Sequence, residues 1–512
     1  MLFLPLFYSF GFLVALLALL GWFYFQRKAG WSRLFQLALF VGLALYLGSV
    51  ASAGAPMDYK LSILFRDLLM LGGAGFLFQF LLRKHPAFLF GLLALGIVLF
   101  WFYRNHLNQT FPYQAPQEVD PEAELLIELK EGLDLDRLAT LTRSYGLQYE
   151  KAFELRDPVR TDLDDYYAVD IPDRRADQWP AIEAAFAESG LVDWVEPNEV
   201  LHLDLPENNR LPEKIRRRFG IDDPGLENLW GFEAMEVDKL LAYLQKKDVQ
   251  PQRKALIAIL DTGIDGKHED IQANYRSIKS GHDNDPRGHG THCAGIAAAV
   301  SNNGVGVASF SRDNSFVEVA SIKVLSAMGS GTQRGIINGM LEAADKGADV
   351  ISMSLGGRST QSRQRAYSKA VKYANDAGAI VVAAAGNSNS NAKDYAPVNA
   401  KGAIGVSALD EQLQRANFSN IVTDLKMGIA APGVNIYSTI PGDKYATYSG
   451  TSMATPYVAG MIGLLKSIRP DLTTAQVHSL LVRTGSHTKN TRETGKLIQP
   501  YEAVRELIEQ GI

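Results

Sequence analysis

The chain has 512 residues, of which 47% are hydrophobic and 21% are charged, and its formal net charge is −5. This length predicts more than one domain, and the near-neutral, slightly acidic balance excludes the basic surface typical of nucleic-acid-binding proteins. A single cysteine, Cys293, excludes an intrachain disulfide.

The first hundred residues are strongly apolar and carry few charges. They contain four apolar runs, Leu2–Phe25, Leu34–Ala53, Leu61–Leu82 and Pro86–Tyr103. Each run is close to the ~20 residues that a helix needs to cross the hydrocarbon core of a bilayer. A signal peptide accounts for the first run at most. We therefore predict that residues 1–104 form a four-helix transmembrane segment.

The distribution of basic residues predicts the orientation of this segment. The first loop carries Arg27, Lys28 and Arg33, the third carries Arg83 and Lys84, and the second carries only Lys60. Because basic loops stay in the cytoplasm, both termini and the chain after Tyr103 should lie on the extracytoplasmic side, periplasmic or extracellular. Arg66 and Asp67 in the third run are interpreted as interfacial residues rather than as a site within the membrane.

A proline-containing linker, residues 105–122, leads to a small predicted α+β domain at residues 123–205. Periodicity predicts strands at Glu124–Lys130, Leu147–Leu155, Asp165–Ile171 and Leu191–Leu203, and helices at Leu135–Ser144 and Ala181–Glu188. The order β-α-β-β-α-β is that of ferredoxin-like domains. The order alone predicts no function for this domain.

A charged connector, residues 206–225, precedes a large domain at residues 226–512. Continuous apolar strands are predicted at Ala255–Leu260, Val317–Leu325, Val350–Met353 and Ile380–Ala384, and helices near Phe232–Lys246, Gly290–Val300, Gln333–Asp345 and Gln361–Ala377. This alternation indicates an α/β fold with a parallel sheet covered by helices on both faces. In such sheets the functional site gathers at the carboxyl ends of the strands.

Four polar side chains occupy such positions. Asp261 and Asn387 follow predicted strands, and His289 and Ser452 open predicted helices. Taken alone, Ser452 is also explained as a helix-capping residue. Together the four residues form a complete set for acyl transfer, with Ser452 as nucleophile and His289 as general base and acid. Asp261 would orient His289, and the side chain of Asn387 would stabilise the oxyanion.

The motifs around these residues resemble those of the subtilases, the subtilisin-like serine proteases. They read LDTGIDGKHEDI, RGHGTHCAG, AAAGN and SGTSMATPYVAG, in the family's order Asp, His, Asn, Ser. The resemblance implies a serine endopeptidase that acts on proteins or peptides and needs no cofactor for its chemistry. With the predicted transmembrane segment, the expected protein is a membrane-anchored protease. The alternative is a catalytically latent membrane receptor or scaffold that uses the same fold.

The resemblance also implies how a substrate is held. Gly329, Ser330 and Gly331 resemble the strand on one side of the substrate, and Ser354, Leu355 and Gly356 resemble the strand on the other. The small domain, which ends in VDWVEPN, resembles the subtilase propeptide, an intramolecular chaperone and inhibitor. The chain is then made as a zymogen whose first partner is its own propeptide domain.

Two weaker features complete the resemblance. A structural calcium site is expected at Asp270, Val300, Asn303, Val305 and Val307, where side-chain and carbonyl oxygens suit Ca²⁺, although a plain turn also explains the loop. Cys293 follows His292 as in proteinase K-like members of the family. A buried small hydrophobic residue is the better interpretation of this cysteine, because Ser452 already fills the place of the nucleophile.

Overall fold

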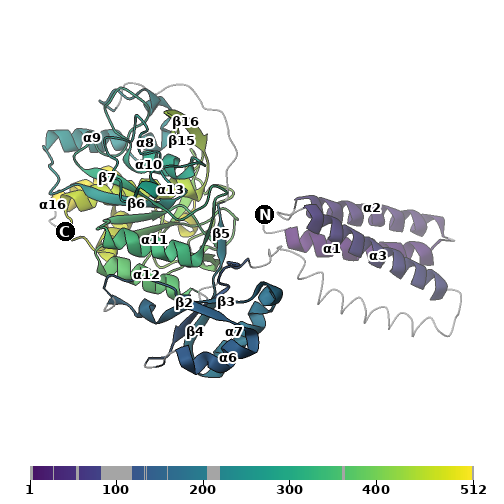
Figure 1. Cartoon of the computed structure of the whole chain (residues 1–512). Coiled ribbons are helices and arrows are strands. Elements are labelled where there is room, and N and C mark those ends of the chain that lie inside the picture. Colours follow the sequence, from purple (N-terminus) through teal and green to yellow (C-terminus); the bar gives the residue numbers. More distant parts are fainter. Residues whose placement is uncertain are drawn as a thin grey trace. The chain divides into compact units, whose positions relative to one another are not determined.

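The computed structural model describes residues 4–26, 28–52, 57–81, 118–131, 133, 135–157, 160–203, 219–359 and 364–509 (Figure 1). The chain separates into two compact units, Met1–Pro116 and Gln117–Ile512.

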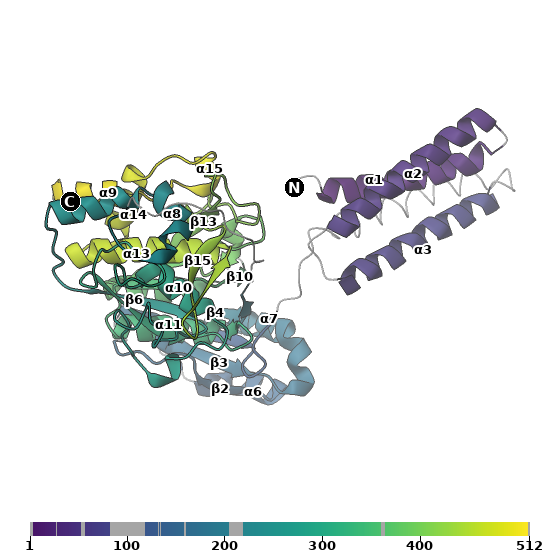
Figure 2. The ribbon, with the colours of Figure 1, turned by 90° about the horizontal axis from the view of Figure 1, so that it is seen from above.

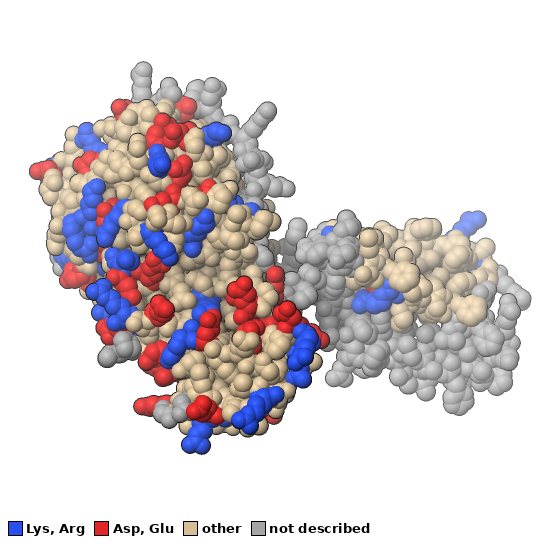
Figure 3. All heavy atoms as spheres, viewed as in Figure 1, with Lys and Arg blue, Asp and Glu red and all other residues tan. Residues whose placement is uncertain are grey.

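The first unit contains three long helices, α1 (Leu4–Tyr24), α2 (Ala29–Ser52) and α3 (Met57–Leu81). Glycines let α1 and α2 pack with their backbones in close contact. A Cβ atom on Gly11 would lie 2.6 Å from the nitrogen of Tyr46, and one on Gly42 would lie 2.5 Å from the nitrogen of Ala15. Small residues permit this close packing in membrane helices. On the face shown in Figure 3, the described residues of the unit carry few charged groups.

Among the described residues, one helix, Ala29–Ala51, is long and apolar enough to cross a membrane. The apolar part of α1, Tyr8–Tyr24, is shorter, and α3 carries Arg66 and Asp67 along its length. The fourth predicted run, Pro86–Tyr103, lies outside the described residues. The prediction of four spanning helices is therefore not confirmed. A single helix of this kind near the N-terminus is typical of a membrane anchor or of a signal sequence.

Asp67 packs in the interior of the helical unit, and its expected position at the membrane interface stays a prediction. Its side chain is fully buried. It accepts hydrogen bonds from the hydroxyl of Tyr8 on α1 and from the hydroxyl of Tyr46 on α2, the latter at 3.0 Å. Arg66 Nε donates to the same carboxylate at 2.7 Å. These bonds tie α3 to both other helices.

The second unit begins with a small α+β domain. Its antiparallel sheet has the order β2-β3-β1-β4. The strands are β1 (Leu125–Leu129), β2 (Gln148–Lys151), β3 (Tyr166–Asp170) and β4 (Val192–Pro197), and the helices are α6 (Ala139–Tyr145) and α7 (Trp179–Ser189). The order of these elements along the chain is the predicted β-α-β-β-α-β.

The last predicted strand of this domain, Leu191–Leu203, is wrong as a single element. It divides into β4 and β5 (Val200–His202), and β5 belongs to a different sheet. It pairs antiparallel with β8 (Ser330–Thr332) of the large domain. Asn198 and Glu199 lie between the two strands, and Asn198 bonds to Ala123 and Asp120 of its own domain. The alternation of apolar and polar residues continues through this turn, so the sequence pattern does not reveal where the strand ends.

The large domain is built on a six-stranded parallel sheet with the order β14-β13-β11-β9-β6-β7. Its strands are β6 (Ala255–Asp261), β7 (Val317–Lys323), β9 (Val350–Met353), β11 (Ile380–Ala384), β13 (Ile404–Leu409) and β14 (Gly428–Pro432). The four predicted strands are confirmed. β13 and β14 add two further buried strands that extend the sheet.

Helices cover both faces of this sheet (Figures 1 and 2). α10 (His289–Ala298) and α13 (Thr451–Ile468) pack together on one face, and α11 (Gln333–Asp345) and α12 (Arg365–Asp376) pack together on the other. The remaining helices are α8 (Trp230–Ala234), α9 (Val237–Lys246), α14 (Thr474–Thr484), α15 (Thr491–Thr494) and α16 (Pro500–Glu509). Two short antiparallel strand pairs complete the domain. One joins β10 (Gly357–Arg358) to β12 (Tyr395–Ala396), and the other joins β15 (Ile436–Ile440) to β16 (Lys444–Tyr448).

The small domain packs on the face formed by α11 and α12 (Figure 1). Glu196, which is fully buried, accepts hydrogen bonds from the side chain of Gln333 at 2.7 Å and from the backbone nitrogen of Arg365 at 3.1 Å. These two residues open α11 and α12, so one carboxyl group meets the positive ends of both helices. Asn198 Oδ1 accepts from the nitrogen of Arg334 at 3.0 Å in the same way.

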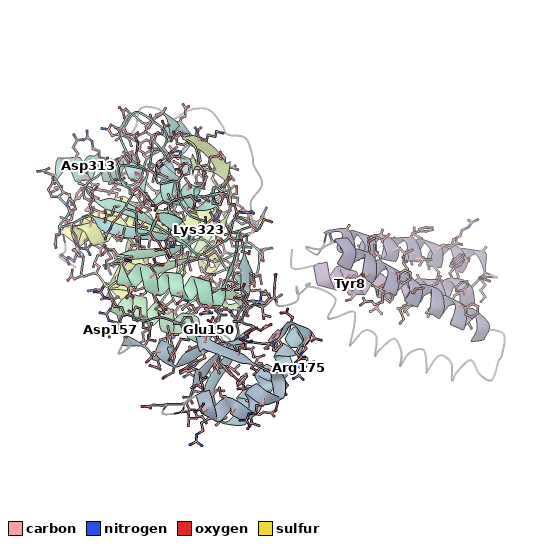
Figure 4. All side chains as sticks on the ribbon, viewed as in Figure 1. Tyr8, Glu150, Asp157, Arg175, Asp313 and Lys323 are labelled. Atoms are coloured by element: carbon pink, nitrogen blue, oxygen red, sulfur yellow. The ribbon has the colours of Figure 1, made fainter. Side chains whose placement is uncertain are left out.

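Ion pairs surround this buried contact. Glu128, which is 4% exposed, pairs with Lys369 of α12 at 2.7 Å, and Asp162 pairs with the same lysine at 2.8 Å. Arg334 of α11 pairs with Glu150, which Figure 4 places at the edge of the small domain facing that helix. The contact between the domains is therefore charged as well as apolar.

Candidate active site

Strand β6 and helix α10 bring Asp261 and His289 together. Nδ1 of His289 lies 2.8 Å and 2.9 Å from the two carboxylate oxygens of Asp261, and both side chains are at most 1% exposed. A nitrogen placed between two carboxylate oxygens must carry the proton and donate it. The other ring nitrogen, Nε2, is then the one that accepts, and it is buried without a hydrogen-bond partner among the described residues.

The charge of Asp261 favours the protonated form of the imidazole. Burial acts to lower the pKa of His289, but the attraction of Asp261 and its hydrogen bond outweigh burial, so the pKa lies above its ordinary value of 6.5. Asp285 adds to this increase and Arg287 opposes it. His289 is therefore a stronger base than a buried imidazole without these partners.

Ser452 lies in the first turn of α13, as the sequence predicts, and is 5% exposed. Its hydroxyl donates to the carbonyl oxygen of Ser354 at 3.0 Å rather than to His289. The carbonyl oxygen of Ser452 in turn accepts from the Ser354 hydroxyl at 2.7 Å. The Ser452 hydroxyl and Nε2 of His289 are therefore not hydrogen-bonded to each other in this structure.

Asn387 follows strand β11, and its side-chain orientation is fixed from behind. Its oxygen Oδ1 accepts from the nitrogen and from the hydroxyl of Thr451, each at 2.9 Å. With Oδ1 held in this way, the amide nitrogen Nδ2 faces the opposite direction. Asn387 lines the same cleft as Ser452, so an N–H donor and a hydroxyl lie at one opening.

The cleft beside Ser452 is bordered by a segment of this chain itself. Its lining comprises Leu203, Ser354, Leu355, Gly356, Ala384, Gly386, Asn387, Thr451 and Ser452. Leu203 follows β5 directly, and its nitrogen donates to the oxygen of Gly329 at 2.9 Å. The pairs Leu201–Gly331 and His202–Ser330 continue this ladder. Both predicted substrate strands therefore border the same extended segment, β5 and Leu203. The sequence did not show that this segment pairs with β8.

Comparison with known proteins identifies the large domain. The Subtilase family model matches residues 252–498. Thermitase from Thermoactinomyces vulgaris is 44% identical over 228 residues, which are 44% of this chain and 78% of thermitase. Subtilisin DY from Bacillus licheniformis is 39% identical over 254 residues, which are 48% of this chain and 89% of that protein. The chain is a subtilase. It is accordingly a serine endopeptidase of the subtilisin type.

Among solved structures, this subtilase is similar to a protease from Pseudoalteromonas arctica. The TM-score is 0.48 at 28% sequence identity, and the match covers 56% of this chain and 98% of the other.

The residues expected to hold calcium in this subtilase lie together around Asp270. The carboxylate of Asp270 is fully buried and accepts from Asn303 Nδ2 at 2.9 Å and from the nitrogen of Val307 at 2.7 Å. The nitrogen of Val300 donates to the Asp270 carbonyl, and Val305 donates to Asn303 Oδ1. Burial raises the pKa of Asp270 to about 8. Both carboxylate oxygens thus accept N–H donors here, and Asn303 Oδ1 is held by the nitrogen of Val305, so calcium binding at these residues stays a prediction.

Cys293 lies close to the catalytic residues but does not have the character of a nucleophile. It is fully buried, and its Sγ lies 3.6 Å from the carbonyl oxygen of Ser452. Burial raises the pKa of its thiol, so the reactive thiolate is disfavoured. The neighbouring His292 stacks on Tyr448, and burial lowers its pKa to about 3, so it stays neutral.

Sequence reasoning missed the hydrogen bonds that hold the candidate site residues in place. Thr451 fixes Asn387, the carbonyl of Ser354 holds the Ser452 hydroxyl, and Asp285 binds the start of α10. Each acts through a hydrogen bond that joins segments far apart in the chain or crosses a loop. The only signal in the sequence is their position beside the motifs, and position does not reveal which way a side chain points.

Proposed function

We propose that this subtilase cleaves peptide bonds through an acyl-enzyme on Ser452. The observation that carries the proposal is the buried Asp261–His289 pair with an unpartnered Nε2, in a domain where Ser452 and Asn387 share one cleft. Nε2 takes the proton of the Ser452 hydroxyl as Oγ bonds to the substrate carbonyl carbon. It then gives this proton to the leaving amine as the C–N bond breaks, and water releases the acyl group by the reverse sequence.

Asn387 would stabilise the negative oxygen of the tetrahedral intermediate, together with the backbone nitrogen of Ser452 at the start of α13. The fixed orientation of its amide by Thr451 supports this role, because a donor held in advance needs no reorganisation. Loss of one such donor costs about 2.7–4 kcal/mol in a subtilisin, so Asn387→Ala should lower kcat by about 10²–10³-fold.

The small domain would act as a propeptide that inhibits the enzyme until it is removed. Its strand β5 pairs with β8, and Leu203 lines the cleft that contains Ser452. An extended segment in this position blocks a substrate that needs the same main-chain bonds. We propose that the enzyme cuts its own chain on the carboxyl side of Leu203 and before Phe219, which would separate the propeptide from a catalytic domain at residues 226–512.

A serine-directed fluorophosphonate tests the catalytic assignment directly. The protein freed of its small domain should be labelled at Ser452, the intact chain should be labelled more slowly, and Ser452→Ala should not be labelled. Labelling at another residue, or none in folded protein freed of the small domain, would reject the assignment. Unchanged processing of the chain in Ser452→Ala would show that another protease makes the cut.

We further propose that helix α2 anchors the chain in a membrane and that the catalytic domain lies on the extracytoplasmic side. The apolar stretch Ala29–Ala51 supports an anchor, and the basic residues Arg27, Lys28 and Arg33 beside it support this orientation. The experiment is a blot of membrane and soluble fractions, with the wild type beside Ser452→Ala. The uncut variant should remain entirely in the membrane fraction, and its appearance in the soluble fraction would reject an anchor.

A further inference from the structure

Asp285 is a second buried carboxylate beside the catalytic pair. It lies in the loop that leads into α10 and is 6% exposed. Its oxygen Oδ1 accepts from the hydroxyl of Thr262 at 2.8 Å and from the nitrogen of Gly288 at 2.8 Å. Oδ2 accepts from the nitrogen and from the hydroxyl of Thr291, each at 2.8 Å. Both oxygens are therefore fully engaged.

These bonds replace a local helix cap. The residue before α10 is Gly288, whose left-handed backbone (φ 90°) suits glycine and which has no side chain to cap the helix. Asp285 binds the nitrogen of Thr291 in the first turn, and Thr262 Oγ1 binds the nitrogen of Gly290 at 3.1 Å. The free nitrogens at the start of the helix are thus satisfied by the loop and by the end of β6.

The same bonds join the two parts of the catalytic pair. Thr262 directly follows Asp261 at the end of β6, and Gly290 directly follows His289 at the start of α10. Thr262 contacts both Asp285 and Gly290, so the strand end and the helix start are fastened to one another independently of the Asp261–His289 contact. Movement of His289 away from Asp261 would break this second set of bonds as well.

Asp285 also acts on His289 through its charge. The charged groups that influence this imidazole are Asp261 and Asp285, which favour its protonated form, and Arg287, which opposes it. The nearby His292 is neutral and adds no charge. Because both acids are buried, little solvent screens their effect.

We propose that Asp285 is a positioning residue of the reaction: it fixes Asp261 and His289 as one rigid piece, and its negative charge stabilises the imidazolium formed during acyl transfer. The inference rests on the proposed roles of Asp261, His289 and Ser452. It is separable from them, because Ser452→Ala tests the reaction itself and leaves the contacts of Asp285 intact.

The test is Asp285→Asn in the full chain, assayed on a short chromogenic peptide across a range of pH. We expect kcat to fall by about 10-fold or more while KM changes by less than about twofold, because substrate contacts are untouched. Removal of the negative charge should also move the acid limb of the kcat/KM profile to lower pH, since His289 loses its proton more readily. Asp283→Asn is the matched control, because Asp283 lies in the same loop but contacts Tyr275 and Ser277.

A second variant covers the case in which Asp285→Asn does not fold. Thr262→Val keeps the charge of Asp285 and removes the hydroxyl that joins the end of β6 to Asp285 and to Gly290 of α10. We expect kcat to fall by about 3- to 10-fold with the acid limb unmoved. The proposal is overturned if folded Asp285→Asn keeps the wild-type kcat, if its kcat falls with no movement of the acid limb, or if Thr262→Val keeps the wild-type kcat. Any of these results beside an inactive Ser452→Ala would leave the proposed function standing.

Discussion

Replacement of Glu196 by alanine should release the small domain from the catalytic domain. The carboxyl group of Glu196 is fully buried and meets three donors of the large domain, the side chain of Gln333 and the backbone nitrogens of Arg365 and Ala366. A fourth donor, Trp194 Nε1 at 2.9 Å, belongs to the small domain itself. Only the first three bonds form when the domains come together, so only they contribute to docking.

The cost follows from the donors left without a partner. A buried donor that loses its acceptor costs about 1–3 kcal/mol, and water entering the space of the lost side chain recovers part of that cost. For three donors we expect a net loss of about 3 kcal/mol, which weakens docking by about 100-fold. Asp193→Ala is the matched control, because Asp193 lies on the same strand with an exposed side chain.

The assay uses the full chain with an affinity tag at its carboxyl end. In the wild type the small domain should be retained on the column, and the activity on a short peptide should be low. In Glu196→Ala the processed small domain should wash away and the peptidase activity should rise, whereas Asp193→Ala should behave like the wild type. Full retention and unchanged inhibition in Glu196→Ala would refute the reasoning, because docking would then depend on the ion pairs and the β5–β8 ladder alone.

Three further predictions concern pH, calcium and a buried lysine. Burial raises the pKa of Glu196 from its ordinary 4.5 to about 8, so docking takes up a proton. This contribution is complete below about pH 4.5 and is lost as the pH rises through about 8, so gel filtration should find weaker docking at alkaline pH and a smaller pH effect in Glu196→Gln. If Asp270 holds calcium, EDTA should lower the Tm of the wild type by about 5–10 °C and leave that of Asp270→Asn unchanged. Lys466, 2% exposed, donates to the oxygen of Gly378 at 2.6 Å, so Lys466→Met should cost about 1–3 kcal/mol in urea denaturation.

The positions of the four candidate site residues could be predicted from the sequence because these residues stand at the ends of regular elements. A parallel sheet requires continuous apolar strands, and its strand ends meet at one edge. Asp261 ends β6 and Asn387 follows β11, and both strands belong to the same parallel sheet. The alternation of apolar strands and helices therefore predicts the positions of these residues in the fold, although it says nothing about their contacts.

The course of the chain between β4 and β5 could not be predicted in this way. Residues on both sides of Asn198 alternate as in one strand, but Val200 pairs with Thr332 of the large domain rather than with a strand of its own. The partner of an edge strand depends on which surface it meets, and that information lies elsewhere in the chain. Asp67 shows the same limit, since two tyrosines on other helices decide that it lies in the interior.

The segment from Trp194 to Leu203 holds the docking contacts and the proposed inhibitory contacts in one continuous stretch. Glu196 and Asn198 bind the starts of α11 and α12, β5 pairs with β8, and Leu203 lines the cleft. All of these contacts lie on the amino side of any cut after Leu203. Such a cut therefore removes the covalent connection but none of the bonds that hold the domain in place. If the small domain is the proposed inhibitor, release of the active enzyme would require a second event, either a loss of these contacts or destruction of the freed domain.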